Sequence, residues 1–323
     1  MNRFTRTAAL AAAAVVAATT LAACGSSDSS GDSGGGSRTI GVSFAAPTIS
    51  LYAGIQKGIK AEADRLGVDV VFTDASGDAA KQANDINDLI ARGVDGILVS
   101  GIDPNAIVAP LQAAKAANIP VMTVARDVAD PELRTSYIGN DWSASGKLIA
   151  DWTCENVKTG KIAMIEGPSS APYVQEMTKA YTAVIGSASC PDMEVAYQTN
   201  VDQLTAEEGL KATQEALSAV PDAAVVYANL DDFLKGSLQA INEAGKKGDI
   251  TVTGFDGIPE TLEMVRSGDV GYEIALQPKK WGATALTSMI DHLDGKEVGD
   301  SVKIDVLPFD KTNAADITEA ELE

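Results

Sequence analysis

The sequence predicts an α/β protein of two similar lobes, each built on a doubly wound parallel sheet. Short apolar runs typical of strands alternate with helical runs, which is the pattern of βαβ units. The pattern starts again near residue 160, so the chain carries two copies of one architecture. About 285 residues follow residue 37, more than most single hydrophobic cores accommodate, and two lobes are therefore expected.

The first half alternates four main strands with three helices. The predicted strands are 39–44, 68–72, 95–99 and 120–124, and the predicted helices are 51–66, 79–92 and 104–117. The strands are nearly continuous apolar runs, as expected when helices cover both faces of a sheet. Ser50, Asp78 and Asp103 stand at helix starts as N-caps, the last followed by Pro104 at the first helical position.

The second half repeats this order after a short strand at 136–138 and a connecting helix at 142–158. The predicted strands are 161–166, 193–197, 223–227 and 250–255, and the predicted helices are 172–187, 205–218 and 231–245. A strand at 271–276, a helix at 278–293 and one last strand at 302–308 follow. In doubly wound sheets a ligand lies at the carboxyl ends of the strands, and two lobes make two such edges face one cleft.

The N-terminus has the pattern of an export signal. Arg3 and Arg6 precede an uncharged segment, residues 7–23, that ends in Leu-Ala-Ala before Cys24. The segment is shorter and less apolar than a membrane span, and Leu-Ala-Ala-Cys resembles the bacterial lipobox, in which the Cys carries a diacylglyceryl thioether. We expect cleavage after residue 23, lipidation of Cys24 and retention at the outer face of the cell membrane. A plain signal peptide with an incidental Cys is the alternative.

A polar segment follows the lipidation site. Residues 25–37 (GSSDSSGDSGGGS) contain only Gly, Ser and Asp, so they have no apolar side chain to bury. This composition is typical of a flexible linker. We expect residues 24–37 to act as a lipidated Cys with a tether, and the folded domain to begin at Arg38.

Charge and composition exclude several functions. The formal net charge is −20, and loss of Arg3 and Arg6 takes the mature chain to −22, which opposes binding to nucleic acid. His292 is the only histidine, and no metal site or cofactor is expected. Ser169 and Ser170 have no recognisable base partner, and no phosphate-binding loop is present, so we expect no enzyme.

Two cysteines remain after Cys24. Cys154 and Cys190 would lie in an oxidising compartment, where an even pair often forms a disulfide. Two buried free thiols are the alternative, because the geometry that decides between them is not contained in the sequence.

Six stretches carry a resemblance to a known family. They are GIQKGIKAEADRLG (54–67), ANDINDLIARGVDGILVS (83–100), ANIPVMTVARD (117–127), YIGNDWSASGKLIADW (137–152), GFDGIPETLEMVRSGD (254–269) and IALQPKKWGATA (274–285). In order and spacing they resemble the ribose/galactose-type sugar-binding proteins of ABC importers. The resemblance implies a monomer with a three-segment hinge. Its N-terminal lobe comprises 38–139 plus 278–304, and its C-terminal lobe comprises 140–277 plus 305–323.

The family's ligand contacts are only partly kept. Arg126 matches the Arg of an Asp-Arg pair, but Ala125 replaces its Asp, for which Asp127 is the nearest substitute. Asp256 matches the Asp of the family's GFDG turn. Asp231 matches the capping half of an Asn-Asp pair.

The other contacts are displaced or replaced in this chain. The Asn of the Asn-Asp pair falls at Leu230, beside Asn229. The family's Gln falls one residue before Gln277, an Arg is replaced by Gln175, and Tyr52 is the remaining aromatic of the first loop.

Two residues next to the first hinge complete the candidate ligand set. Trp142 offers a ring on which a sugar stacks, and Asn140 precedes it. Core packing for Tyr52 and Trp142, a hinge cap for Asn140, and a structural ion pair for Arg126 with Asp256 are the alternatives. Trp152, Phe233 and Trp281 are interpreted as packing residues.

These residues predict an extracytoplasmic solute-binding lipoprotein that captures a sugar or polyol and delivers it to an ABC permease. Because the site has fewer polar groups than its family, a polyol or a deoxy sugar suits it as well as ribose does. A sensory protein that presents a small polar ligand to a membrane receptor is the alternative, since the same closure serves both.

Overall fold

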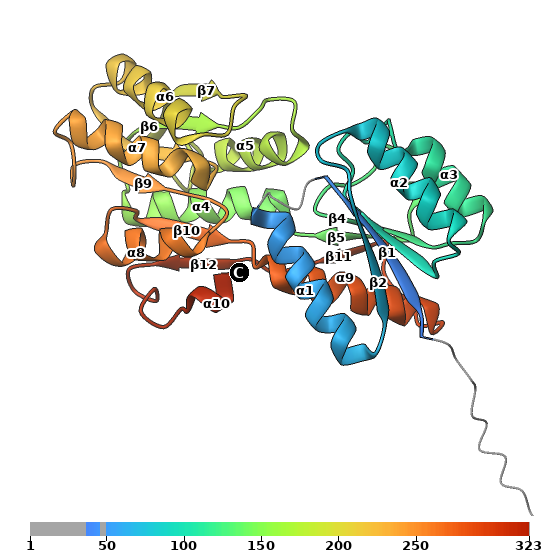
Figure 1. Cartoon of the computed structure of the whole chain (residues 1–323). Coiled ribbons are helices and arrows are strands. Elements are labelled where there is room, and N and C mark those ends of the chain that lie inside the picture. Colours follow the sequence, from blue (N-terminus) through green and yellow to red (C-terminus); the bar gives the residue numbers. More distant parts are fainter. Residues whose placement is uncertain (1–36, 46–49, 323) are drawn as a thin grey trace, which may run out of the picture. The chain divides into compact units, whose positions relative to one another are not determined.

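The computed structural model describes residues 37–45 and 50–322 (Figure 1). The export segment, Cys24 and nearly all of the tether therefore lie outside the described residues. Ser37–Glu323 forms one compact unit that contains two six-stranded sheets. Two lobes built on parallel sheets confirm the predicted fold class. None of the helices in the described part of the chain is long and apolar enough to span a bilayer.

The first sheet has the strand order β11-β5-β4-β3-β1-β2, and all its pairs are parallel. Its strands are β1 (Thr39–Phe44), β2 (Asp69–Asp74), β3 (Gly96–Val99), β4 (Val121–Val124), β5 (Ser136–Gly139) and β11 (Ser301–Lys303). The helices of this lobe are α1 (Ser50–Leu66), α2 (Ala79–Ala91), α3 (Val108–Ala116) and α9 (Pro278–Leu293), with a 3₁₀ turn at Pro131–Leu133. Helix α1 packs on α9, and α2 packs on α3.

The second sheet has the order β12-β10-β9-β8-β6-β7. Its strands are β6 (Gly160–Glu166), β7 (Met193–Asn200), β8 (Ala223–Ala228), β9 (Thr251–Thr253), β10 (Tyr272–Ala275) and β12 (Leu307–Asp310). Only β12 runs antiparallel to its neighbour among these described strands. The helices are α4 (Trp142–Asn156), α5 (Pro172–Val184), α6 (Ala206–Ala219), α7 (Asp231–Glu243), α8 (Pro259–Ser267) and α10 (Glu319–Leu322). We call the first sheet and its helices lobe 1, and the second sheet and its helices lobe 2.

Most predicted elements agree with the structure to within three residues, but two predictions were wrong. The single strand expected at 302–308 is two strands, and β11 joins the first sheet whereas β12 joins the second. The helix expected at 104–117 begins only at Val108. The reason is that the Asp103 carboxylate accepts a hydrogen bond from the Asn105 N–H at 2.8 Å, which stabilises a turn in place of a helix start. The Asp78 cap is confirmed, since it accepts from Ala80 and Lys81 N–H.

Close helix contacts in lobe 1 depend on small residues. Gly58 of α1 faces Lys279 of α9, and Gly282 of α9 faces Ile55 of α1. A Cβ at either glycine would overlap the main-chain carbonyl oxygen of its partner. The two helices therefore approach each other more closely than any residue with a side chain would permit.

Cys154 and Cys190 are joined by a disulfide, with their Cα atoms 5.6 Å apart. Cys154 lies in α4, and Cys190 lies in the turn between α5 and β7. The bond therefore ties a helix of lobe 2 to the start of the edge strand β7. The largest core cluster includes side chains from both lobes, among them Ile40 of β1, Met164 of β6 and Trp281 of α9.

Candidate functional site

The polar residues singled out in the sequence follow the carboxyl ends of strands in both sheets. In lobe 1, Arg126 follows β4 and Asn140 follows β5. In lobe 2, Asn229 follows β8, Asp256 follows β9 and Gln277 follows β10. In doubly wound sheets this is the edge at which ligands bind.

Three residues at these strand ends have a positive φ angle, a backbone conformation that is unfavourable for residues other than glycine. Ala125 has φ = +65°, Asp256 has φ = +115° and Gln277 has φ = +55°. The Arg126 N–H donates to the Val124 carbonyl at 2.7 Å, which closes a tight three-residue turn around Ala125. Such conformations cost on the order of 1–3 kcal/mol each and concentrate at binding sites.

Trp142 is the centre of an aromatic cluster. Its ring centroid lies 5.5 Å from that of Tyr173, 6.0 Å from that of Phe255 and 6.2 Å from that of Trp281. Trp142 starts α4 and Trp281 belongs to α9, so the cluster joins helices of both lobes. Trp142 and Tyr173 are half-buried, whereas Phe255 and Trp281 are buried. Partly exposed rings of this kind give flat apolar faces to a ligand.

Tyr173 connects this cluster to the charged residues. Burial raises the pKa of its hydroxyl, the negative charge of Asp256 raises it further, and the positive charge of Arg126 lowers it. Both charges are therefore close enough to act on the same hydroxyl, although Arg126 belongs to lobe 1 and Asp256 to lobe 2. The strand ends of the two lobes thus converge on Tyr173.

Arg126 is exposed, and none of the described residues accepts a hydrogen bond from its guanidinium group. Asp256 is half-buried, and its carboxylate accepts from the N–H of Asp231 at the start of α7. Burial raises the pKa of Asp256, and the carboxylates of Asp231 and Asp232 raise it further. No described ion pair joins Arg126 to Asp256, so both remain available to a polar ligand.

Two buried amides near the strand ends have unused polar atoms. Asn140 donates to Ser145 Oγ at 3.1 Å, but its Oδ1 is buried with no donor among the described residues. Asn229 accepts from the Gly167 N–H at 2.9 Å, and its Nδ2 likewise has no acceptor in the described part of the chain. A buried polar atom without a partner costs about 1–3 kcal/mol, which makes both amides candidates for ligand or water contacts.

Three other candidates are engaged elsewhere. Asp127 accepts from Thr123 Oγ1 at 2.7 Å and from two nitrogens of Arg134 at 2.7 and 2.9 Å, so its carboxylate is used within lobe 1. Gln175 is exposed and donates to the Ser169 carbonyl at 2.8 Å. Tyr52 is 2% exposed, and its hydroxyl lies 3.0 Å from Ser100 Oγ. These contacts favour structural roles.

Sequence reasoning did not identify Tyr173, Phe255 and Tyr137 as site residues. Tyr173 follows Pro172 at the start of α5, directly after the loop that leaves β6. Tyr137 donates to the Ala125 carbonyl at 3.2 Å, and burial raises the pKa of its hydroxyl to about 12. For Tyr173 and Phe255 the sequence did contain a signal, which was their position after strands β6 and β9, because residues beyond the carboxyl ends of strands in a doubly wound sheet lie near the ligand edge.

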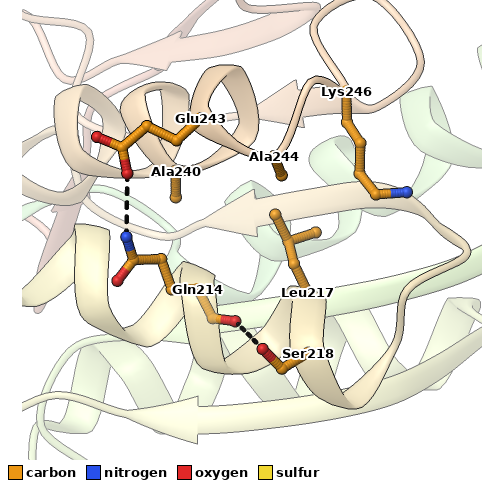
Figure 2. A pocket seen from close by; sticks show the side chains of 7 residues that line it. All are labelled: Gln214, Leu217, Ser218, Ala240, Glu243, Ala244 and Lys246. Carbon is orange, nitrogen blue, oxygen red and sulfur yellow. Dashed lines mark hydrogen bonds between the residues drawn. The ribbon is translucent and has the colours of Figure 1, made fainter.

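A surface groove between α6 and α7 lies away from this region (Figure 2). It is lined by Gln214, Leu217, Ser218, Ala240, Glu243, Ala244 and Lys246. Gln214 Nε2 donates to Glu243 Oε2 at 3.1 Å across the groove. These residues lie in the C-terminal halves of the two helices or just beyond α7, whereas the strand ends that bear Asn229 and Asp256 adjoin helix N-termini. No cluster of three metal-ligating side chains occurs in the residues that the structure describes.

The fold, together with the polar and aromatic residues at the strand ends of both lobes, defines a periplasmic binding protein of the two-lobed, parallel-sheet type. The chain belongs to the family described as periplasmic binding protein domain, whose model matches residues 40–297. The resemblance to ribose/galactose-type binding proteins is thereby confirmed.

Named relatives agree with this assignment. The ribose import binding protein RbsB of Bacillus subtilis is 30% identical over 261 residues, which cover 80% of this chain and 83% of that protein. RbsB of Escherichia coli is 28% identical over 79% of this chain and 84% of its own length. These relatives are solute-binding proteins and not enzymes.

Solved structures show the same fold. A periplasmic ribose ABC transporter protein from Conexibacter woesei has a TM-score of 0.81 and 26% identity, and the match covers 87% of this chain and 94% of that one. A solute-binding protein from Mycobacterium smegmatis with bound glycerol has a TM-score of 0.77 and 29% identity, with 87% and 96% covered.

Proposed function

We propose that the mature protein captures a sugar or polyol between the strand ends of its two lobes and delivers it to an ABC permease. The observation that carries this proposal is the convergence of Arg126, Asp256 and the Trp142 cluster on Tyr173. Charged forks bind hydroxyl groups, while aromatic faces pack against the apolar faces of a sugar ring. Both elements are present, and each of them draws residues from both lobes.

The composition of the site indicates a ligand with few hydroxyl groups. Ala125, Leu230 and Leu276 occupy positions where the resembled family has polar contacts, and Gln175 is held by its own loop. Each hydroxyl of a bound ligand that finds no partner costs about 1–3 kcal/mol. A small polyol, a deoxy sugar or a pentose therefore fits better than a hexose with all its hydroxyl groups.

Binding from two lobes gives a physical basis for delivery. A ligand that contacts Arg126 of lobe 1 and Asp256 of lobe 2 stabilises the closed arrangement over the open one by its differential affinity. Closure then changes the surface that a permease contacts. Lipidation at Cys24 and the tether 25–37 would keep the receptor near that permease and raise its effective concentration there.

A ligand screen tests the proposal. Thermal-shift and calorimetric measurements on the protein without its N-terminal 24 residues should show binding to at least one of ribose, arabinose, galactose and glycerol, with amino acids and nucleosides as comparison sets. Binding confined to an amino acid or a nucleoside would disprove the carbohydrate assignment. Reconstitution with a candidate ABC permease of the same organism, followed by uptake of the labelled ligand, tests delivery.

A further inference from the structure

Two acidic side chains face each other in the interior of lobe 2, beneath the turn that carries Asp256. Asp231 is 4% exposed and Glu273 is fully buried. Glu273 Oε1 accepts from the Ile274 N–H at 2.9 Å, and Asp231 Oδ2 accepts from the Ile258 N–H at 2.8 Å. The other two oxygens, Asp231 Oδ1 and Glu273 Oε2, are buried and have no donor among the described residues. The unused oxygens belong to carboxyl groups that interact directly with each other.

A hydrogen bond between two carboxyl groups requires a proton on one of them, because two carboxylates have no hydrogen to share. No described ion pair includes Asp231 or Glu273, and two buried carboxylates without a cation repel each other strongly. Burial raises the pKa of Asp231 to about 7. The pKa of Glu273 is raised well above its usual range by burial and by the charge of Asp231.

Among the residues that the structure describes, no cation compensates the charge of this pair. The groups that face the pair are acidic or neutral: Asp232 of α7, Asp256 after β9, Tyr227 of β8 and Tyr272 of β10. Farther out, Glu166 of β6 faces Tyr227, and Tyr272 is faced by Asp310 of β12 and by Asp151 and Glu155 of α4. The cations nearby act on other groups, Lys235 on Asp232 and Arg126 on Tyr173. A proton bound to one of the two carboxyl groups therefore takes the place of a cation at this pair.

The pair also holds the Asp256 turn from two sides. Asp231 accepts the Ile258 N–H through its side chain, and its own N–H donates to the Asp256 carboxylate. At the other end of the turn, a Cβ on Gly254 would overlap Glu273 Oε2, so the glutamate carboxyl packs directly on the backbone there. A change in the separation of the two carboxyl groups therefore moves both ends of the segment that bears Asp256.

We propose that Asp231 and Glu273 share one proton and that this proton positions the Asp256 turn for the ligand. Both are positioning residues, since they act through the turn. The inference rests on the proposed function in one respect, that Asp256 contacts the bound solute. Loss of the shared proton leaves two repelling carboxylates, shifts the turn and weakens binding.

The direction of the pH effect follows from linkage. The folded state holds this proton more tightly than the unfolded chain, in which carboxyl groups titrate near pH 4. Its stabilising contribution is complete below about pH 4 and is lost as the pH rises through about 7 and beyond. The part of the ligand affinity that depends on this proton should follow the same course and fall by up to about tenfold per pH unit above the titration.

The variant Glu273→Gln tests the proton directly. The Gln amide donates a hydrogen to Asp231 at every pH, so it replaces the shared proton with one that does not titrate. We expect this fall in affinity for the strongest-binding sugar or polyol between pH 6 and 9 in the wild type and its loss in Glu273→Gln, while the Asp256 carboxyl titrates in both proteins. The control is Glu166→Gln, because Glu166 is another buried carboxyl of lobe 2, held by Thr178 and Gln198. It should keep the wild-type profile.

A ligand-free measurement separates this inference from the proposed function. Amide hydrogen exchange at Ile258, corrected for intrinsic base catalysis, should accelerate with pH in the wild type and not in Glu273→Gln. If no sugar binds, the proposed function fails while this exchange difference still reports on the proton. Coincident exchange and affinity profiles for wild type and Glu273→Gln would overturn the inference. Asp231→Asn, which supplies an amide from the other side, replaces Glu273→Gln if that variant does not fold.

Discussion

Replacing Arg126 with Ala removes a guanidinium group that is exposed and has no hydrogen-bond acceptor among the described residues. Nothing in the described fold depends on this side chain, so the free energy of unfolding should change by less than about 0.5 kcal/mol. Its position on the tight turn after β4, near Tyr173, makes it a ligand contact in the proposed function. The substitution should therefore separate binding from stability.

The expected loss of affinity can be estimated from the chemistry of the contact. A hydrogen bond that involves a charged group contributes about 1.5–3 kcal/mol. This corresponds to a dissociation constant that rises about 10- to 150-fold. Arg126→Lys keeps the charge but not the planar fork, so its affinity should lie between those of the wild type and Arg126→Ala.

The assay is isothermal titration calorimetry with the solute found by the ligand screen, combined with thermal unfolding of the same samples. Arg92→Ala is a matched control, because Arg92 is also an exposed arginine of lobe 1 but caps the C-terminal end of α2, away from the strand ends. It should change neither quantity by much. Unchanged affinity in Arg126→Ala, or an equal loss in Arg92→Ala, would refute the reasoning.

Three further predictions concern stability and anchoring. Replacing Cys154 and Cys190 with Ala opens a loop whose ends are 36 residues apart. In the chain-entropy picture, urea denaturation should show that the free energy of unfolding falls by about 4 kcal/mol. An unchanged free energy of unfolding would mean that the bond does not constrain the unfolded chain. Gly282→Ala should destabilise the protein by about 1–3 kcal/mol, since its Cβ would overlap the main chain of α1. Gly299→Ala should lie within about 0.5 kcal/mol of the wild type, because the new Cβ would be 3.5 Å from the carbonyl oxygen of Ser301. Cys24→Ala should leave solute binding intact and release the protein from membranes in cell fractionation; continued membrane retention would argue against the lipid anchor.

The sequence by itself determined the elements of this protein and the family to which it belongs. Apolar runs of strand length and helical stretches are local patterns, so β1 and α9 were predicted at their observed limits. The Asp78 cap was also predictable, because a capping carboxylate bonds to N–H groups only two and three residues away. Interactions of short sequence range leave their signature in the sequence.

The tertiary structure decided which residues meet. The segment 302–308 divides between two sheets because β5 and β10 each leave an edge open to it, which a strand pattern does not reveal. Arg134 forms an ion pair with Asp127, so Asp127 is no longer a candidate ligand contact. The sequence around Asp127 does not distinguish it from Asp256.

The environment of buried polar residues is likewise decided by the tertiary structure and not by the local sequence. Glu273 lies within a strand and would be expected at a solvent-facing position by its charge, yet it is fully buried beside Asp231. Tyr173 lies near the charges of both Arg126 and Asp256, although more than 40 residues of chain separate it from each of them. Whether a charge is paired, protonated or open to a ligand depends on neighbours that only the folded chain brings together, because electrostatic and desolvation energies depend on distance in space and not on distance in sequence.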